Sequence, residues 1–356
     1  MRILVIGGTR FIGPQTAQRL VAEGHEAAVF HRGETEGALP EEVHHIHCPG
    51  ARLGDRSHFA AYRSELRDWK PDVVLDMVCL TAKDAQILLD TFRGRAWRAV
   101  VISSQDVYRA YGRLIGTEPG PPDSLPLDED APLREKHFPY RGEKPRDAGD
   151  PRAWMDDYDK ILVERAVMEE SGLAGTILRL PMVYGPYDYQ HRLFPHLKPM
   201  QDGRAALLLQ ADYAGWRWTR AYVENVAAAV ALAVTDERAA GRIYNVGAAR
   251  SLTMIEWVRA IGRAAGWEGR IVTLPADEIP EHLRETMDLR QELVTDSGRI
   301  RRELGYAEPV PFEEGLRRTV AWEAENPPES FDPAQFDYAA EDEALSRTGW
   351  NGWAGS

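Results

Sequence analysis

The sequence predicts an α/β protein in which a doubly wound parallel sheet is followed by a smaller C-terminal α/β domain. Short apolar runs alternate with segments of helical periodicity along the first half of the chain, an order typical of strands that pair in parallel. The first apolar run ends in glycines, and polar residues follow the fifth run, where open sheets of this class bind ligands.

The start of the chain carries the pattern on which this prediction depends. Arg2 to Ile6 is an unbroken apolar run, typical of a strand buried on both faces. The turn after it reads Gly7, Gly8, Thr9, Arg10, Phe11, Ile12, Gly13. Glycines let the backbone approach an anion closely, and the N-terminus of the helix that follows attracts one. We therefore predict that residues 7–13 hold the pyrophosphate of a dinucleotide in a Rossmann-type domain.

The second predicted strand, Glu26 to Phe30, ends at His31 and Arg32. In a dinucleotide fold an acid at this position selects NAD, whereas an arginine pairs with the 2′-phosphate of NADP. A histidine stands where the acid is expected, and an arginine follows it. The sequence therefore favours NADP(H) over NAD(H), with a solvent-exposed loop arginine as the alternative.

The third predicted strand, residues 43–48, contains histidines that resemble a metal site. Imidazole is a zinc ligand, but side chains alternate along a strand, so His45 and His47 face one side and His44 the other. A second group of ligands at matching spacing does not follow. We therefore predict an ordinary strand and no metal site.

Two more strands complete the predicted sheet, at residues 72–78 and 99–102, with a helix over 83–92 between them. Asp55 precedes a helix predicted over residues 59–69. It is expected either to contact the adenine amino group or to cap that helix.

A series of motifs then runs to about residue 325. They are Ser103–Tyr108, Lys160–Glu164, Leu178–Pro186, Tyr222–Ala227, Tyr244–Gly247 and Arg302–Gly305. In this order they resemble the extended short-chain dehydrogenase/reductases, a group that includes nucleotide-sugar epimerases and dehydratases. The resemblance implies cofactor contacts at Ser103, Lys160 and Pro181 and the oxidation or reduction of a sugar-like carbinol.

The glycine turn departs from the usual Gly-x-x-Gly-x-x-Gly of that group, because Arg10 stands at the middle glycine. This form resembles an atypical subgroup, and also the chloroplast stem-loop-binding proteins, which are RNA-associated relatives. An arginine does not permit the same close backbone approach, but its guanidinium can bind a phosphate.

The second departure concerns the chemistry. In this group a tyrosine four residues before the lysine is the acid/base, but here Tyr158 lies only two residues before Lys160. Two residues on a helix rotate the side chain by roughly 200°, so the pair shares a face only if the entry to the helix is irregular. Ser104 matches the serine that holds the substrate oxygen. Asp106 is a second candidate for proton transfer, with a turn cap as its alternative.

Residues 116–153 form a long insertion rich in proline, glycine and charge. Loops of this length are usually lids, binding loops or disordered segments, so we expect the insertion to cover the active site, with 116–126 as its more mobile part. Inside it Tyr140 and Lys144 also match the family spacing, but flanking glycine and proline oppose a helix. We interpret this match as chance.

The motifs divide the chain into a dinucleotide-binding domain, 1–180 with 221–247 returning to it, and a substrate domain, 181–220 with 248–325. The acidic segment 326–356 is either a solvated tail or packed across the body. Cations and flat rings in the substrate domain suit a phosphate and a stacked base or sugar. The candidates for substrate contact are Tyr184, Arg192, Arg217 and Arg220.

Composition limits the partners. A net charge of −13 opposes nucleic-acid binding, and no stretch reaches the roughly 18 apolar residues of a membrane helix. With only two cysteines the chain has no disulfide framework. We expect a cytoplasmic NADP(H)-dependent epimerase, dehydratase or reductase that acts on a sugar-like small molecule. The resemblance to a group that often dimerises through the lysine-bearing helix implies a homodimer as one option. The alternative is a non-catalytic dinucleotide-binding protein, regulatory or RNA-associated.

Overall fold

The structure, a computed structural model, describes the chain except residues 36–38, 51–52, 148 and 350–356. Its centre is a seven-stranded sheet with the order β10-β6-β5-β4-β1-β2-β3, in which every neighbouring pair is parallel. The strands are β1 (Arg2–Ile6), β2 (Glu26–His31), β3 (His44–His47), β4 (Val73–Asp76), β5 (Arg98–Ser104), β6 (Ala174–Leu180) and β10 (Arg242–Asn245). The predicted fold class is confirmed.

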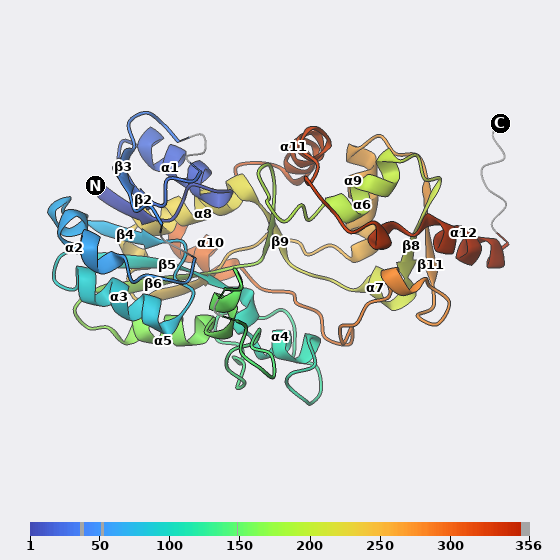
Figure 1. Ribbon diagram of the computed structural model, residues 1–356, viewed down its shortest axis with the longest axis horizontal. Helices are drawn as coiled ribbons and strands as arrows, with labels where there is room; N and C mark the ends of the chain where they lie inside the picture. Colours follow the sequence, from blue (N-terminus) through green and yellow to red (C-terminus); the bar gives the residue numbers. More distant parts are fainter. Residues whose placement is uncertain (36–38, 51–52, 148, 350–356) are drawn as a thin grey trace.

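Helices cover both faces of this sheet (Figure 1). One layer contains α1 (Ile12–Ala22) and α8 (Val223–Thr235), and the other contains α2 (Phe59–Asp68), α3 (Ala82–Phe92) and α5 (Lys160–Glu169). Alternate residues of β1 enter opposite layers: Ile3 and Val5 join the cluster of α1 and α8, whereas Leu4 and Ile6 join that of α3 and α5. Burial on both faces explains why the strands are continuous apolar runs.

A smaller lobe lies beside the sheet (Figure 1). It contains α6 (Phe194–Gln201), β8 (Ala206–Gln210), α7 (Ala211–Gly215), α9 (Met254–Ala264), β11 (Arg270–Leu274) and α12 (Tyr338–Arg347). Between the lobes run β9 (Arg220–Tyr222), which pairs with β7 (Met182–Tyr184), and α11 (Phe312–Glu325). α10 (Gly298–Leu304) instead packs against β10 of the large sheet and against α8. Two parallel strand pairs, β8 with β11 and β7 with β9, stand apart from the large sheet. None of the described helices has the length and apolar character that a membrane crossing requires.

In the C-terminal part of the described chain, α12 packs on the smaller lobe, whereas most residues from 327 to 337 are exposed. α12 buries Ala344 and Leu345 against Leu208 of β8, and the Tyr338 hydroxyl donates to Asp202 Oδ2 at 2.6 Å. Of the two alternatives for this segment, packing across the body is the one that the structure has for α12. Trp350 and Trp353 lie outside the described residues.

Several described residues anchor the insertion to the body. The insertion begins behind α4 (Arg109–Leu114), and the Asp123 carboxylate accepts hydrogen bonds from Arg109 and Arg113. The Glu118 carboxylate accepts two backbone N–H groups later in the same insertion, at 2.6 and 3.0 Å. Residues 116–126 are therefore held to the body by charge-assisted contacts, and the rest of the insertion reaches the carboxyl end of β5.

Candidate functional site

A pocket of about 430 Å³ opens at the carboxyl ends of β1, β2 and β4, and the glycine turn lines it. Gly7 and Gly8 have φ angles of 81° and 88°, in the region that favours glycine. A Cβ on Gly8 would lie 2.7 Å from the Val5 side chain, and a Cβ on Gly13 would lie 2.2 Å from the Gly8 Cα. The turn thus has room for bare backbone only, which is the close strand-to-helix packing that a pyrophosphate site requires.

The departure at Arg10 is accommodated by the residue after it. Phe11, and not Arg10, has the positive φ angle, 51° with a ψ of −101°, a conformation that is costly for a bulky residue. The Phe11 ring is buried in the core, which holds the backbone in place. Arg10 is exposed, lines the pocket, and donates from Nε to Thr35 Oγ1 at 3.4 Å.

The far wall of the pocket contains Arg32 and Asp55. The Arg32 guanidinium pairs with Glu34 at 3.2 Å. The Asp55 carboxylate accepts the Ser57 N–H at 2.8 Å, and this bond lowers the pKa of Asp55. His58, and not Asp55, stands at the N-cap of α2. The capping role proposed for Asp55 is therefore wrong, because the chain makes one more turn before the helix begins.

Arg56, which sequence reasoning missed, forms a buried ion pair behind this wall. Its two terminal nitrogens donate to both carboxylate oxygens of Asp76 at 2.6 and 2.8 Å, and its Nε lies 3.4 Å from Asp84. Burial opposes the positive charge, but the two carboxylates outweigh it and raise the pKa of Arg56. The pair ties the Asp55 loop to the end of β4.

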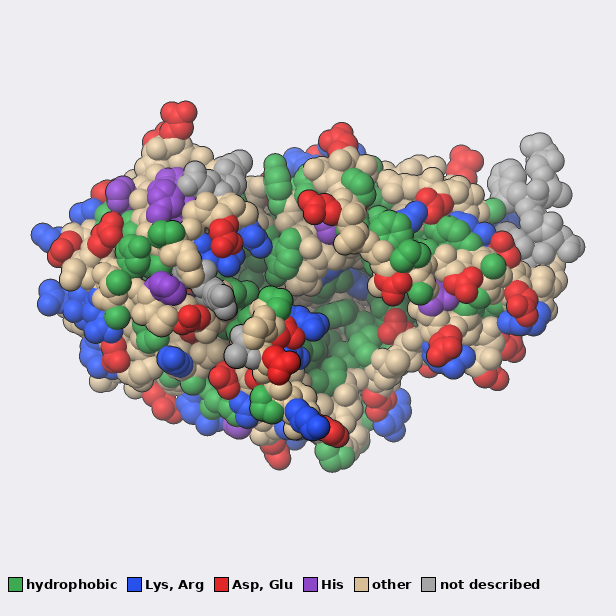
Figure 2. Space-filling view, in the orientation of Figure 1, with side chains coloured by type: hydrophobic (Ala, Val, Ile, Leu, Met, Phe, Trp, Pro, Cys, Tyr) green, Lys and Arg blue, Asp and Glu red, His purple; other side chains and the backbone are tan. Residues whose placement is uncertain are grey.

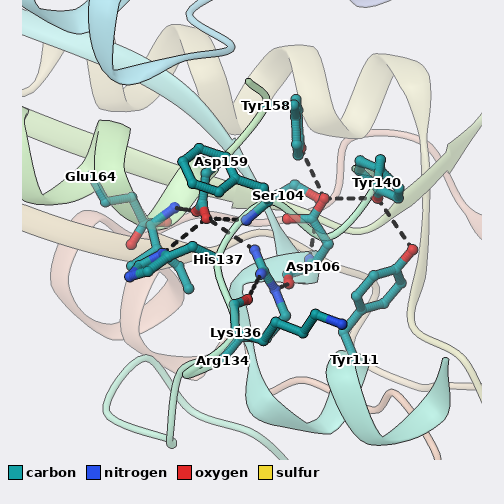
Figure 3. A network of polar contacts seen from close by, with 12 residues as sticks. Ser104, Asp106, Tyr111, Arg134, Lys136, His137, Tyr140, Tyr158, Asp159 and Glu164 are labelled. Carbon is teal, nitrogen blue, oxygen red and sulfur yellow. Dashed lines mark hydrogen bonds and ion pairs between the residues drawn. The ribbon is translucent and has the colours of Figure 1, made fainter. Parts of the chain in front are cut away.

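The second part of the site lies at the carboxyl end of β5 and centres on Asp106 (Figure 3). Ser104 ends β5, and its Oγ accepts the Asp106 N–H at 3.2 Å. The Tyr158 and Tyr140 hydroxyls both donate to Asp106 Oδ2, at 2.8 and 2.9 Å. The Tyr111 hydroxyl lies 3.2 Å from that of Tyr140. No helix of the described chain joins Tyr140 to Lys144, in agreement with the interpretation of their spacing as chance. Tyr140 nevertheless belongs to this network through its hydrogen bond to Asp106.

The Asp106 carboxylate is buried, and only one of its two oxygens accepts hydrogen bonds from described residues. The residue is 5% exposed, and burial raises the pKa of its carboxyl group while Arg134 and the tyrosines lower it. Its Oδ1 atom is buried and has no hydrogen-bond partner among the described residues. A buried acceptor without a donor costs about 1–3 kcal/mol. Asp106 Oδ1 is therefore a position where a donor from a ligand would be stabilising.

Tyr158 and Lys160 lie on the same side of the site although two residues separate them. α5 begins at Lys160, and Asp159 before it is extended, with φ −158° and ψ 107°. Tyr158 thus precedes the helix, and its ring centre lies 5.8 Å from Lys160 Nζ. The irregular entry that the short spacing requires is present in the structure.

Lys160 is held at the ends of β4 and β5. Its Nζ donates to the carbonyls of Cys79 and Ile102, at 2.6 and 2.8 Å. Burial lowers the pKa of Lys160. Ile102 and Leu80 line the pocket, so the lysine fixes the backbone at the inner end of the pocket.

Residues around α5 connect the pocket with the Asp106 network. Trp154 lines the pocket and its ring lies 6.0 Å from that of Tyr158. Asp159 accepts hydrogen bonds from His137 Nδ1 and the Phe138 N–H, at 2.9 and 2.8 Å. This anchor fixes the segment that carries His137 and Phe138, and Tyr140, two residues later, reaches Asp106 (Figure 3).

Two expected cofactor contacts do not face the pocket with their side chains. The Ser103 hydroxyl donates to Glu164 Oε1 at 2.5 Å, and Glu164 is also paired with Arg179 inside the fold. Pro181 joins β6 to β7 and is not among the residues that line the pocket. Alternation along β5 explains the first result, because Ser104 and Ser103 must point to opposite faces.

Three of the four substrate candidates contact other side chains of the protein. Arg192 pairs with Asp188 and Arg217 with Glu292, each at 2.6 Å. Tyr184 is buried and packs edge-on against Trp257, with ring centres 4.9 Å apart. These three side chains already have protein partners.

Arg220 is different, because it is a buried cation without a carboxylate partner among the described residues. Its guanidinium lies 4.7 Å from the Trp257 ring centre, and its Nε has no hydrogen-bond partner in the described structure. Burial lowers the pKa of Arg220 to about 10. Figure 2 shows the surface hollowed between the two lobes, with apolar and cationic side chains on its walls.

The sequence and the fold are similar to those of known proteins. The sequence model of the NAD dependent epimerase/dehydratase family matches residues 156–247. The crystal structure of a Thermus thermophilus UDP-glucose 4-epimerase in complex with NAD has a TM-score of 0.62 and 23% identity, covering 92% of this chain and 100% of that chain. At this identity the likeness shows the shared fold.

Three relatives match most of the sequence. The 2′-dehydrokanamycin reductase of Streptomyces kanamyceticus is 27% identical over 80% of this chain and 72% of its own length. A dTDP-glucose 4,6-dehydratase of Streptomyces niveus is 28% identical over 92% of this chain and 94% of its own length. The chloroplast stem-loop binding protein of 41 kDa b of Arabidopsis thaliana is 24% identical over 88% and 77%.

The family match, the motif series and the seven-stranded sheet agree. Two of the relatives are enzymes, a reductase and a dehydratase. The chain is similar to the NAD-dependent epimerases and dehydratases, in agreement with the resemblance of its motifs to the extended short-chain dehydrogenase/reductases.

Proposed function

We propose that this enzyme binds NADP(H) and epimerises, dehydrates or reduces a sugar-like carbinol, with nucleotide sugars as the leading substrate class. The observation that carries the proposal is the buried Asp106 carboxylate, which has two tyrosine donors on Oδ2 and, among the described residues, none on Oδ1. Trp154, which packs against Tyr158, connects the Asp106 network to a pocket whose glycine turn tolerates no added Cβ at Gly8 or Gly13.

The residues of the pocket fit a dinucleotide. The backbone of residues 7–13 and the Arg10 guanidinium would hold the pyrophosphate, and Lys160 would orient the nicotinamide ribose. Arg32 and Asp55 would contact the 2′-phosphate and the adenine. When bound, the cofactor supplies hydride transfer at the carbinol carbon.

Asp106 is our candidate for the group that moves the proton. Its Oδ1 would take the proton of the substrate hydroxyl as the carbinol is oxidised. Ser104 would hold the reacting oxygen in position. A carboxyl whose pKa is raised by burial is better matched to proton exchange near neutral pH. Tyr158 would support this step from Oδ2, because its hydroxyl already donates to that atom.

The preference for NADP(H) is supported by Arg32 and by the absence of an acid at the end of β2, where His31 stands. The Arg32–Glu34 pair opposes it, since a 2′-phosphate would have to displace Glu34. The Thermus epimerase was solved with NAD, so both dinucleotides belong in the test.

The substrate class is supported by Arg220. A buried guanidinium without a carboxylate partner in the described chain is stabilised by an anionic ligand, and a sugar diphosphate supplies one. A neutral sugar would leave the charge of Arg220 without an anionic partner. We also propose a cytoplasmic homodimer formed through the helix that carries Lys160, as family members often form.

The competing function is a non-catalytic dinucleotide-binding protein, regulatory or RNA-associated. It is favoured by the likeness to a stem-loop binding protein and by the commitment of the Tyr158 hydroxyl to Asp106. The net charge of −13 opposes RNA binding.

The test has two stages. NADPH and NADH are first titrated by fluorescence, and the loaded protein is then mixed with nucleotide sugars and with the matching free sugars while cofactor absorbance and products are followed. Turnover of nucleotide sugars that is lost in Asp106→Asn is the expected result. Dinucleotide binding without turnover of either sugar set would establish the competing function, and no dinucleotide binding would refute both.

A further inference from the structure

Three histidines meet on one face of the sheet at its β3 edge. His45 and His47 lie on the same side of β3, as predicted, and β2 pairs with β3 so that His31 stands opposite His47. His31 Nε2 lies 2.9 Å from His45 Nδ1. One nitrogen from each of the three rings lies within 4.8 Å of the others. The predicted absence of a metal site overlooked this cluster because its third member comes from the neighbouring strand.

We propose that His31, His45 and His47 bind a divalent transition-metal ion of the Zn²⁺ type. Imidazole is a good ligand for Zn²⁺, Co²⁺ and Ni²⁺, and three protein ligands leave one position for water or an anion. Two nitrogens bound at about 2.0 Å to a tetrahedral ion are roughly 3.3 Å apart. The observed 2.9 Å between His31 and His45 is therefore close to a chelating distance.

An ion that binds here changes at least two contacts of His31. It replaces the hydrogen bond between His31 and His45. It also moves the His31 proton to Nδ1, which now accepts the Gly33 N–H at 3.2 Å. Gly33 has a φ angle of 80° in the loop after β2, and a glycine there can turn its amide at low cost.

The position of the cluster gives it a connection to the pocket. His31 is buried at the end of β2 and lines the dinucleotide pocket, whereas His47 is exposed at the sheet edge. The adjacent Arg32 charge is balanced by Glu34. The inference depends on the cluster alone and not on the proposed reaction.

The test uses the full chain without a polyhistidine tag, treated with chelator and kept in phosphate-free buffer. Co²⁺ is titrated while its visible absorption is recorded, and Zn²⁺ is then added as a competitor. We expect one Co²⁺ per chain with the intense bands of tetrahedral coordination, displaced by Zn²⁺. His45→Gln and His47→Gln are each expected to weaken Co²⁺ binding at least about tenfold.

His44→Gln is the matched control, because His44 is an exposed histidine on the opposite face of the same strand. Metal-free thermal unfolding checks that each variant is folded, and the exposed position of His47 makes His47→Gln decisive if His45→Gln is not. Absence of the tetrahedral bands, or equal Co²⁺ affinity in wild type and His47→Gln, would overturn the proposal. So would a loss confined to NADPH affinity, which would instead assign the cluster to the 2′-phosphate.

Discussion

The glycine turn after β1 and the Asp106 network after β5 lie at the same edge of the sheet, but they are built in different ways. The turn is seven consecutive residues, and its shape depends on backbone packing between Gly8 and Gly13. The network joins Asp106 to tyrosines 34 and 52 residues later in the chain. A continuous backbone motif can be recognised from spacing, whereas a network of side chains depends on how distant segments fold together.

The largest expected effect is a loss of turnover in a variant of the Asp106 network that leaves cofactor binding at the glycine turn unchanged. Asp106→Asn keeps the shape of the side chain but removes its ability to take a proton, so kcat should fall by about 10²–10⁴. The Kd for NADPH should change less than about twofold, since Asp106 is not among the residues that line the pocket. Stopped-flow turnover and fluorescence titration measure the two quantities.

Asp157→Asn is the control for this variant, because Asp157 has a carboxylate that is 78% exposed and pairs with Arg141. It should leave both quantities at the wild-type values. Equal kcat in Asp106→Asn and wild type would remove Asp106 from the chemistry and return the proton to Tyr158.

The second effect acts on the turn alone. Gly13→Ala places a Cβ 2.2 Å from the Gly8 Cα, so we expect NADPH affinity to fall about tenfold or more and the free energy of unfolding to fall by about 1–3 kcal/mol. Gly215→Ala, which meets nothing within 4 Å, is the matched control. Wild-type affinity in Gly13→Ala would show that the cofactor does not depend on this turn.

The third effect tests cofactor choice at the wall of the same pocket. Arg32→Ala should weaken NADPH binding about tenfold and leave NADH binding unchanged, because only the former loses a charge-assisted contact. Arg217→Ala, which also removes an arginine paired with a glutamate, should alter neither dinucleotide. A parallel loss for NADH and NADPH would contradict 2′-phosphate recognition.

The smallest effect is a pH shift in the network. The hydrogen bond from Tyr140 lowers the pKa of Asp106 against the burial that raises it. Tyr140→Phe should therefore raise that pKa, so that the acid limb of the kcat/KM profile moves to higher pH and activity at neutral pH falls a few-fold. Tyr187→Phe, at a tyrosine that is 57% exposed, should keep the wild-type profile. A shift to lower pH would contradict the role of this hydrogen bond.

The raised pKa of Asp106 should also make the stability of the fold depend on pH. Because the folded-state pKa of Asp106 is raised, this carboxyl favours folding when it is protonated, and its contribution is lost as pH rises through the folded pKa. Asp106→Asn should remove that part of the pH dependence from denaturant unfolding. A wild-type pH dependence in the variant would contradict the assignment.

Much of the fold could be predicted because it depends on local pattern. The first strand was expected over Arg2 to Ile6 and has those bounds, and the helix expected over 83–92 is α3. Prediction failed where the geometry depended on a loop conformation or on contacts between distant segments. Asp55 is no cap because the chain turns once more before α2. The place of Tyr140 in the site was not predicted, because it depends on a contact between residues 34 positions apart in the chain.

The sequence by itself determined the parallel sheet and the glycine turn, because strand periodicity and missing side chains act between neighbours in the chain. It also identified Ser104, Asp106, Tyr158 and Lys160 as candidates without an order among them. Only the tertiary structure decided that Asp106 is the hub, because the insertion must fold over β5 before Tyr140 can reach it. The histidine cluster needs the pairing of β2 with β3 in the same way. Contacts of this kind join residues far apart in the chain, and their geometry is determined only when the whole sheet has formed.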